Sequence, residues 1–134
     1  MKILFKKATI LNPQSPHHST NQDILIIGDI IVEIAKNIKA DKEIKVYEFE
    51  NLHVSSGWFD SGVSFGEPGY EERETLSNGL EVAAKSGFTK ILLNSNINPI
   101  PDSKSIIVHL IKMARGYTTS LYPIGALTLK SKDF

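Results

Sequence analysis

Cysteine is absent from this sequence of 134 residues. Its absence excludes a disulfide-stapled secreted scaffold and a zinc site built from cysteine thiolates. The chain also lacks an excess of one charge, because 15 Lys and Arg residues balance 15 Asp and Glu residues. Proteins that hold DNA or RNA by electrostatics usually carry a basic excess. The sequence therefore predicts no nucleic-acid partner.

Long apolar runs are missing as well. No segment approaches the roughly 18 uncharged apolar residues that cross a bilayer, and the apolar run before Lys6 and Lys7 is too short for a signal peptide. We therefore expect a soluble, cytoplasmic protein with no membrane partner. Hydrophobic residues make up 41% of the chain and charged residues 22%, a balance typical of a folded domain and unlike that of a disordered chain.

The N-terminal part of the chain is rich in short β-forming runs. These runs lie at residues 3–5, 8–11, 24–27, 30–34 and 44–47. Gly28-Asp29 separates two of them as a tight hairpin turn would, and the segment from Asn12 to Pro16 has the composition of a loop. The pattern predicts an all-β domain over residues 1–51.

From residue 52 onward, β runs alternate with stretches of helical period. One helical stretch begins at Leu76 and ends at a Ser86-Gly87 cap, and a second is capped by Asp102 or Ser103 and closed by Gly116. Strands are predicted at residues 52–59, 90–94 and 119–124. The order β-α-β-α-β calls for right-handed crossovers between parallel strands. The sequence therefore predicts an α/β segment over residues 52–134.

The predicted start of the first helix is acidic. Glu71, Glu72 and Glu74 follow a turn rich in Gly and Pro, and carboxylates suit the positive end of a helix macrodipole. We expect these residues to be solvated charges in the first turn of the helix.

Several motifs, in order along the chain, carry a more specific signal. They lie at residues 52–60, 65–71, 87–89, 96–99, 102–105 and 122–128, and the second reads Phe65-Gly-Glu-Pro-Gly-Tyr-Glu71. Together they resemble the N-terminal third of a dihydroorotase of the amidohydrolase superfamily. The resemblance covers nearly the whole chain, because the β-rich residues 1–51 are similar to the small β-sandwich domain that precedes the barrel in that family.

The resemblance implies a fold and an activity. Residues 52–134 would form about three βα units at the start of a (β/α)8 TIM barrel, and residues 1–51 would form part of a β-sandwich domain. The chain would then be a piece of a protein about three-fold longer, since such barrels take ~250 residues before added domains. In this family, a zinc centre activates water to interconvert dihydroorotate and carbamoyl aspartate in pyrimidine biosynthesis.

The chain departs from the family at the expected metal site. The family's first barrel strand ends in Asp-x-His-x-His, whereas this chain keeps Asp60 and has Gly62 and Ser64 at the two histidine positions. The two-residue period of a strand would place all three on one face. Glycine offers zinc no ligand, and a neutral hydroxyl is a poor substitute for imidazole. The resemblance therefore predicts a lost metal motif and no zinc cofactor held by this chain.

Two further positions concern the substrate. Gly66 stands where the resemblance implies an arginine that grips the substrate carboxylate, so a bidentate clamp is missing. Asn96 matches the asparagine that contacts substrate after the second strand. A polar turn residue after a strand explains Asn96 equally well. The histidines of this chain lack the spacing of metal ligands; they are His17, His18, His53 and His109.

Three hypotheses for the function follow. The first is a dihydroorotase-like homologue that is catalytically inactive and has a structural or regulatory role. For such a protein the resemblance implies aspartate carbamoyltransferase as a partner. The second is an active cyclic amide hydrolase whose metal ligands come from later strands outside this chain, and the third is a binding module in the β-rich half. The open edges of incomplete sheets favour self-association in each case.

Overall fold

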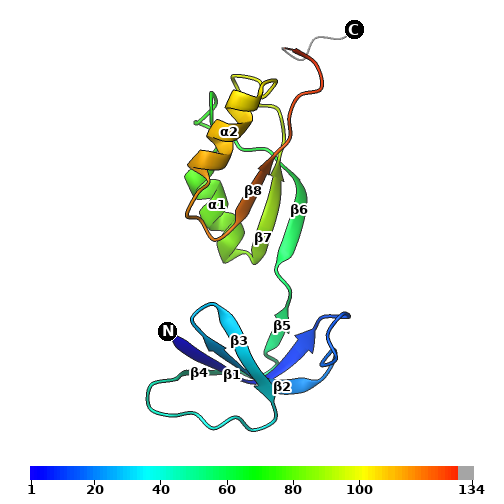
Figure 1. The fold of residues 1–134 in the computed structure, drawn as a ribbon, viewed down its shortest axis with the longest axis vertical. Coiled ribbons are helices and arrows are strands. Elements are labelled where there is room, and N and C mark those ends of the chain that lie inside the picture. Colours follow the sequence, from blue (N-terminus) through cyan, green and yellow to red (C-terminus); the bar gives the residue numbers. More distant parts are fainter. Residues whose placement is uncertain (130–134) are drawn as a thin grey trace. The chain divides into compact units, whose positions relative to one another are not determined.

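The computed structural model describes residues 1–129, which fall into two compact units, each with its own sheet. The first unit is Met1–Ser56, and the second begins at Gly57 (Figure 1). The boundary lies five residues beyond the sequence-based boundary at 51, because residues 53–55 pair with the first strand of the chain. Neither helix among the described residues is long and apolar enough to cross a membrane.

The first unit is a five-stranded sheet. Its strands are β1 (Lys2–Leu11), β2 (Asn21–Ile27), β3 (Ile30–Ala35), β4 (Lys45–Glu48) and β5 (His53–Ser55). The order is β3-β2-β1-β4, with β5 also pairing with β1. The neighbours β1, β2 and β3 are antiparallel, and Gly28 has the positive φ of 68° that a tight hairpin turn requires. The predicted β-rich character and hairpin are confirmed.

The strand β1 contains a bulge, and beside β2 it pairs with two further strands. Lys7 has a φ of 53°, and the pairing register with β2 shifts between Phe5 and Ala8. The first half of β1 then pairs in parallel with β4, and the second half pairs in parallel with β5. The small core of the unit lies beside the bulge, where Ala8 and Ile10 are buried against Ile24.

The second unit alternates strands and helices as predicted. Its elements are β6 (Trp58–Val63), α1 (Leu76–Lys85), β7 (Phe88–Leu93), α2 (Lys104–Met113) and β8 (Ser120–Pro123). The three strands are parallel and lie in the order β6-β7-β8, so the predicted β-α-β-α-β segment is confirmed. Ser86 is the C-cap residue of α1, and Gly87 follows it with a φ of 88°, as the sequence predicts.

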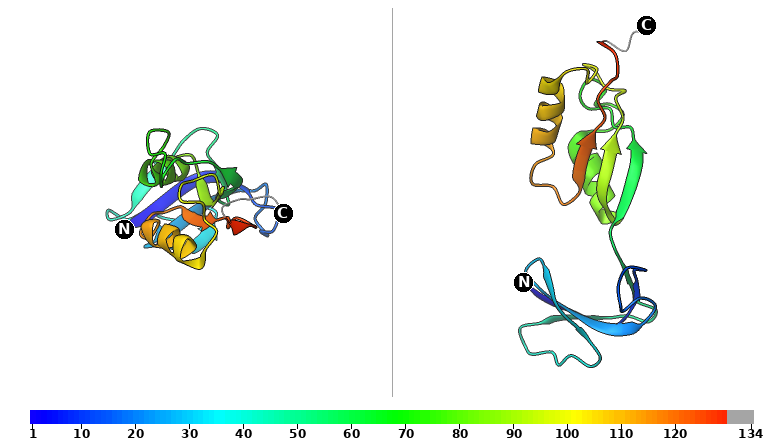
Figure 2. Two further views of the ribbon diagram at one scale, coloured as in Figure 1. Left: turned by 90° about the horizontal axis from the view of Figure 1, so that it is seen from above. Right: turned by 45° about the vertical axis from the view of Figure 1, so that its right-hand side comes forward.

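Both helices pack on the same face of this sheet (Figure 2). Leu76 and Leu80 of α1 and Leu110 of α2 are buried in one cluster with residues of β7 and β8. On the strands, Ile91 and Leu93 point into this cluster. By the two-residue period of a strand, Leu92 and its register partner Tyr122 lie on the other face. That face has no helix over it among the described residues, and Tyr122 is exposed there.

Two sequence-based expectations fail in this region. The predicted strand 52–59 is two strands, because β5 pairs within the first unit and β6 begins the second. The β run is interrupted at Gly57, where an added Cβ would lie 2.0 Å from Cγ2 of Thr89. The acidic residues 71–74 also precede α1 instead of forming its first turn, because Thr75 is the N-cap residue.

Candidate functional site

The carboxyl ends of β6 and β7 bring a small polar cluster together. Ser64 follows β6, and Asn94 and Asn96 follow β7. The side-chain amides of Asn94 and Asn96 each donate a hydrogen bond to Oγ of Ser64, at 3.1 Å in both cases. We call these three residues the Ser64 cluster. Ligands of parallel α/β sheets bind outside the carboxyl ends of the strands, so this is the edge where a site is expected.

Ser64 and Asn96 were both named as site positions from the sequence, and the structure brings them together. Asn94 is the member that sequence reasoning passed over. The sequence did contain a signal for Asn94. It directly follows a buried strand and is two residues before Asn96, so the strand period would place both side chains on one face.

Gly62 faces the Ser64 cluster and has space beside it. An added Cβ at Gly62 would lie 3.7 Å from Oδ1 of Asn94, which is an ordinary van der Waals contact. The backbone N–H of Gly62 donates to Oδ1 of Asp60, at 3.0 Å. A larger side chain at position 62 would therefore meet Asn94 without a clash at its first atom.

Asp60 does not share the face of Gly62 and Ser64, and the expectation that it would is wrong. Asp60 pairs with Ile91 and Val63 pairs with Leu93, so three steps along β6 oppose two steps along β7. The extra residue is a bulge, and it reverses the alternation of side chains. Asp60 and Val63 consequently both line a cavity of about 180 Å³ against α1.

Gly66 lies in a turn that has no room for a side chain. Its N–H donates to the carbonyl of Glu74, and its own carbonyl accepts from the N–H of Tyr70, both at 3.0 Å. An added Cβ would lie 1.6 Å from the carbonyl oxygen of Tyr70. At the position where the resemblance implies a substrate-binding arginine, the turn in this chain therefore has room only for glycine.

The rest of this turn packs on the loop after β7. The N–H of Asn98 donates to the carbonyl of Pro68 at 2.9 Å, and an added Cβ at Gly69 would lie 2.3 Å from the carbonyl oxygen of Asn98. Glu67 is used at the start of α1, where its Oε2 accepts from the N–H of Leu76 at 2.7 Å. Hydrogen bonds from the backbone N–H groups of Gly69 and of Glu71 itself hold the pKa of the Glu71 carboxyl below its ordinary value.

The side chains of the Ser64 cluster are not the types that zinc usually takes as ligands. Zinc in proteins takes thiolate, imidazole and carboxylate ligands, and the Ser64 cluster offers a hydroxyl and two amides. The oxygen of that hydroxyl is already held by both amides. Within residues 1–129, no three His, Cys, Asp or Glu side chains are placed to hold a metal ion. The cluster is suited to hydrogen bonding with an uncharged polar group and contains no general base.

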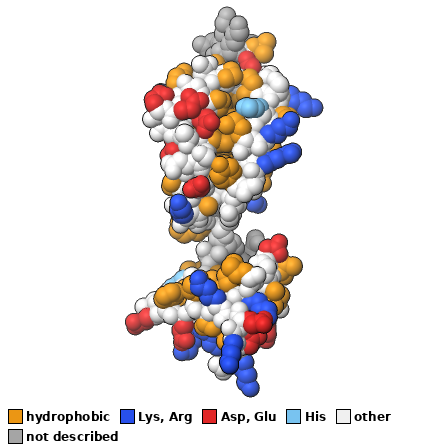
Figure 3. Space-filling view, turned by 90° about the vertical axis from the view of Figure 1, so that its left-hand side faces the viewer, with side chains coloured by type: hydrophobic (Ala, Val, Ile, Leu, Met, Phe, Trp, Pro, Cys, Tyr) orange, Lys and Arg blue, Asp and Glu red, His pale blue; other side chains and the backbone are white. Residues whose placement is uncertain are grey.

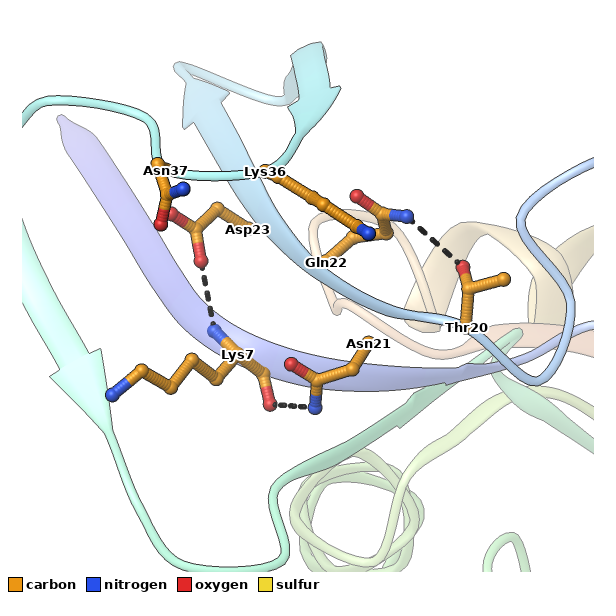
Figure 4. A pocket seen from close by; sticks show the side chains of 7 residues that line it. All are labelled: Lys7, Thr20, Asn21, Gln22, Asp23, Lys36 and Asn37. Carbon is orange, nitrogen blue, oxygen red and sulfur yellow. Dashed lines mark hydrogen bonds between the residues drawn. The ribbon is translucent and has the colours of Figure 1, made fainter.

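The first unit has a larger polar hollow of about 470 Å³ (Figure 4). Its lining residues are Lys7, Thr20, Asn21, Gln22, Asp23, Lys36 and Asn37. The groups at its centre are used within the fold: Asp23 accepts from the N–H of Lys7, and the amide of Asn21 donates to the carbonyl of Lys7. The ammonium group of Lys7 pairs with Glu48 of β4. These contacts stabilise the β1 bulge and give no indication of a catalytic role.

Comparison with known proteins shows that this chain matches one part of several longer proteins. No family model matches the sequence. The dihydroorotase of Anoxybacillus flavithermus is 36% identical over 131 residues, which are 97% of this chain and 30% of that protein. The dihydroorotase of Clostridium acetobutylicum is 29% identical over 126 residues, or 94% of this chain and 30% of that protein. The chain therefore spans about 30% of the length of these curated relatives.

Solved structures agree on the fold. A D-hydantoinase superposes with a TM-score of 0.69 at 20% identity, over 97% of this chain and 29% of its own. A dihydroorotase superposes with a TM-score of 0.62 at 15% identity, over 96% of this chain and 32% of its own. At these identities the superpositions bear on the fold alone.

Proposed function

Because this chain is dihydroorotase-like along nearly its whole length and has the α/β fold of the N-terminal part of amidohydrolase TIM-barrel proteins, we propose that it belongs to a non-catalytic relative of dihydroorotase. Its role is then structural or regulatory. The observation that carries the proposal is Ser64, whose hydroxyl oxygen is held by Asn94 and Asn96 where the resemblance implies a histidine ligand.

The chemical argument concerns the supply of a nucleophile. Zinc lowers the pKa of its bound water from 15.7 to about 7, which provides hydroxide at neutral pH. The Ser64 cluster holds neither the ligands for such an ion nor a base that takes a proton from free water. Without that activation, opening or closing a cyclic amide at this edge of the sheet has no hydroxide source among the described residues.

The turn at Gly66 supports the same proposal. An enzyme that positions dihydroorotate needs a cation for its carboxylate, and arginine supplies two parallel hydrogen bonds for that purpose. Here the turn is closed so tightly that even a Cβ would collide with the carbonyl oxygen of Tyr70. This turn therefore leaves no room for the side chain that the family resemblance implies at position 66, which supports the proposal beside the missing arginine.

Metal analysis combined with an activity assay tests the proposal. We expect purified protein to contain far less than one zinc per chain and to cyclise carbamoyl aspartate no faster than the uncatalysed reaction. A Gly62→His/Ser64→His variant is the matched positive control, because the space beside Gly62 admits a side chain and its two imidazoles would share one strand face. This variant is expected to bind Co²⁺ or Zn²⁺ more tightly than the natural chain. Stoichiometric zinc with turnover in the natural chain would instead establish an active hydrolase that takes ligands from outside these residues.

A regulatory role also needs a partner, and we propose aspartate carbamoyltransferase from the same organism. The proposal rests on the family resemblance alone. Titration of the purified protein into that enzyme, followed by calorimetry, is expected to give a saturable complex with a dissociation constant in the micromolar range or below. Absence of heat and of co-sedimentation at micromolar concentrations would rule this partner out and leave the question of catalysis unaffected.

A further inference from the structure

The outer face of the two helices has its charges divided between two edges. One edge is mainly acidic: α1 and the turn before it carry Glu71, Glu72, Glu74 and Glu81, against the cations Arg73 and Lys85. The other edge is mainly basic: α2 and the residues after it carry Lys104, Lys112 and Arg115, with the carboxylate of Asp102 just before the helix. In the second unit, Figure 3 shows most of the acidic side chains on one side of this face and most of the basic side chains on the other, with hydrophobic side chains between them.

Few of these charges form ion pairs among residues 1–129, although Glu71 accepts a hydrogen bond from the N–H of Gly69 and Glu74 accepts one from the amide of Asn78. Among residues 1–129, the three cations of the basic edge make no ion pair. Glu81 on the acidic edge pairs only with Lys85, one helical turn away, at 3.6 Å and with both side chains exposed. An exposed pair of this kind contributes little to stability and is readily exchanged for another partner.

The middle of the face is apolar and hollowed. A depression of about 290 Å³ is lined by Pro68 and Pro99 from the two loops and by Ser105, Ile106 and His109 of α2. A surface with an apolar centre and a charged rim has the composition of a protein interface.

This face is also the part of the second unit that a larger sheet would leave free. Additional parallel strands would pair with the open edges of β6 or β8, and the sheet face opposite the helices would then be enclosed. The outer side of α1 and α2 would stay exposed to solvent in either case.

We propose that this helical face pairs with the same face of a second copy of the chain. The two-fold axis lies in the interface and runs parallel to the helices, so that the acidic edge of each copy lies against the basic edge of the other. An axis perpendicular to the helices would instead place like charges together. Such an interface is isologous, and each attractive contact occurs twice. The proposal is independent of whether the protein is a catalyst.

Sedimentation of the full chain over a range of concentrations and ionic strengths tests the pairing. We expect a reversible dimer at low ionic strength that dissociates as salt is added. Raising the ionic strength from about 0.01 M to about 1 M shortens the screening length from about 30 Å to about 3 Å. A chain that stays monomeric at all concentrations in low salt would overturn the proposal.

Two charge reversals test the surface and its orientation. Glu81→Lys puts a cation on the acidic edge and Lys112→Glu puts a carboxylate on the basic edge, so each variant alone is expected to dimerise about tenfold more weakly or worse. An equimolar mixture of the two is expected to form a heterodimer that restores the natural affinity. Lys90→Glu, on a strand of the same unit, is the matched control and should have no effect. Association that persists in both single variants would assign the contact to strand edges, and failure of the mixture would refute the axis.

Discussion

Replacing Gly66 with arginine is expected to lower the free energy of unfolding of the second unit by about 3 kcal/mol or more. A Cβ at this position would lie 1.6 Å from the carbonyl oxygen of Tyr70 and 3.1 Å from Cβ of Arg73. The first contact is with backbone, which is held by two hydrogen bonds that close the turn, so no rotamer change relieves it. The substitution that would complete the implied carboxylate clamp is therefore expected to unfold the turn that should present it.

The single tryptophan of the chain makes this effect specific to the second unit. Trp58 lies at the start of β6, with its ring edge-on to Phe88 at a centroid distance of 5.7 Å. Its fluorescence during urea unfolding therefore reports this unit. Gly62→Ala is the matched control, because its Cβ would meet only atoms at 3.7 Å or more, and it should change stability by less than about 1 kcal/mol. If Gly66→Arg and Gly62→Ala unfolded at the same urea concentration, the turn would be more adaptable than the contacts indicate.

The order of strands and helices in the second unit was predictable because each element has a strong local period. Leu76 and Leu80 lie on one face of α1, as their spacing indicates, and both are buried. The break at Gly57 was not predictable in this way, since residues 52–59 read as one β run and only pairing with β1 separates β5 from β6.

The candidate site shows the same division. Its place at the carboxyl ends of β6 and β7 follows from the parallel order of the strands, and the strand period correctly leaves Gly62 and Ser64 facing Asn94. The displacement of Asp60 comes from a bulge, which depends on how β6 and β7 pair and has no local signature in the sequence. The closure of the turn on Gly66 likewise depends on contacts with Tyr70 and Glu74 that only the folded loop reveals.

The ion pair between the buried carboxylate of Asp23 and the partly buried ammonium of Lys6 is expected to have a comparable influence on the first unit. Asp23 is 3% exposed and accepts hydrogen bonds from the ammonium of Lys6 and from the backbone N–H groups of Lys7 and Ile38, the latter two at 2.9 Å. The ammonium of Lys6 also donates to the carbonyl of Ile38 at 3.1 Å. One carboxylate thus joins the β1 bulge, β2 and the segment after β3.

Protonation of Asp23 should weaken this junction. Burial alone would raise the pKa of the Asp23 carboxyl, but the hydrogen bonds from Lys6, Lys7 and Ile38, together with the charge of Lys6, outweigh it and leave the pKa below its ordinary value. Because the folded-state pKa lies below the unfolded-state value of about 3.9, the stabilisation is complete above that pH. It is lost as the pH falls through the folded-state pKa.

Asp23→Asn is therefore expected to destabilise the first unit by about 2–3 kcal/mol at neutral pH, because it leaves the half-buried ammonium of Lys6 without its counter-charge. The difference from the natural chain should shrink progressively below about pH 4. Amide hydrogen exchange at Lys7 and Ile38, whose N–H groups donate to Asp23, reports this unit directly. Glu43→Gln breaks only the exposed pair with Lys2 and is the matched control, which should leave the stability of the unit nearly unchanged. A difference between the natural chain and Asp23→Asn that stayed constant from neutral pH to below about pH 3 would show that the charge of Asp23 is not what stabilises the bulge.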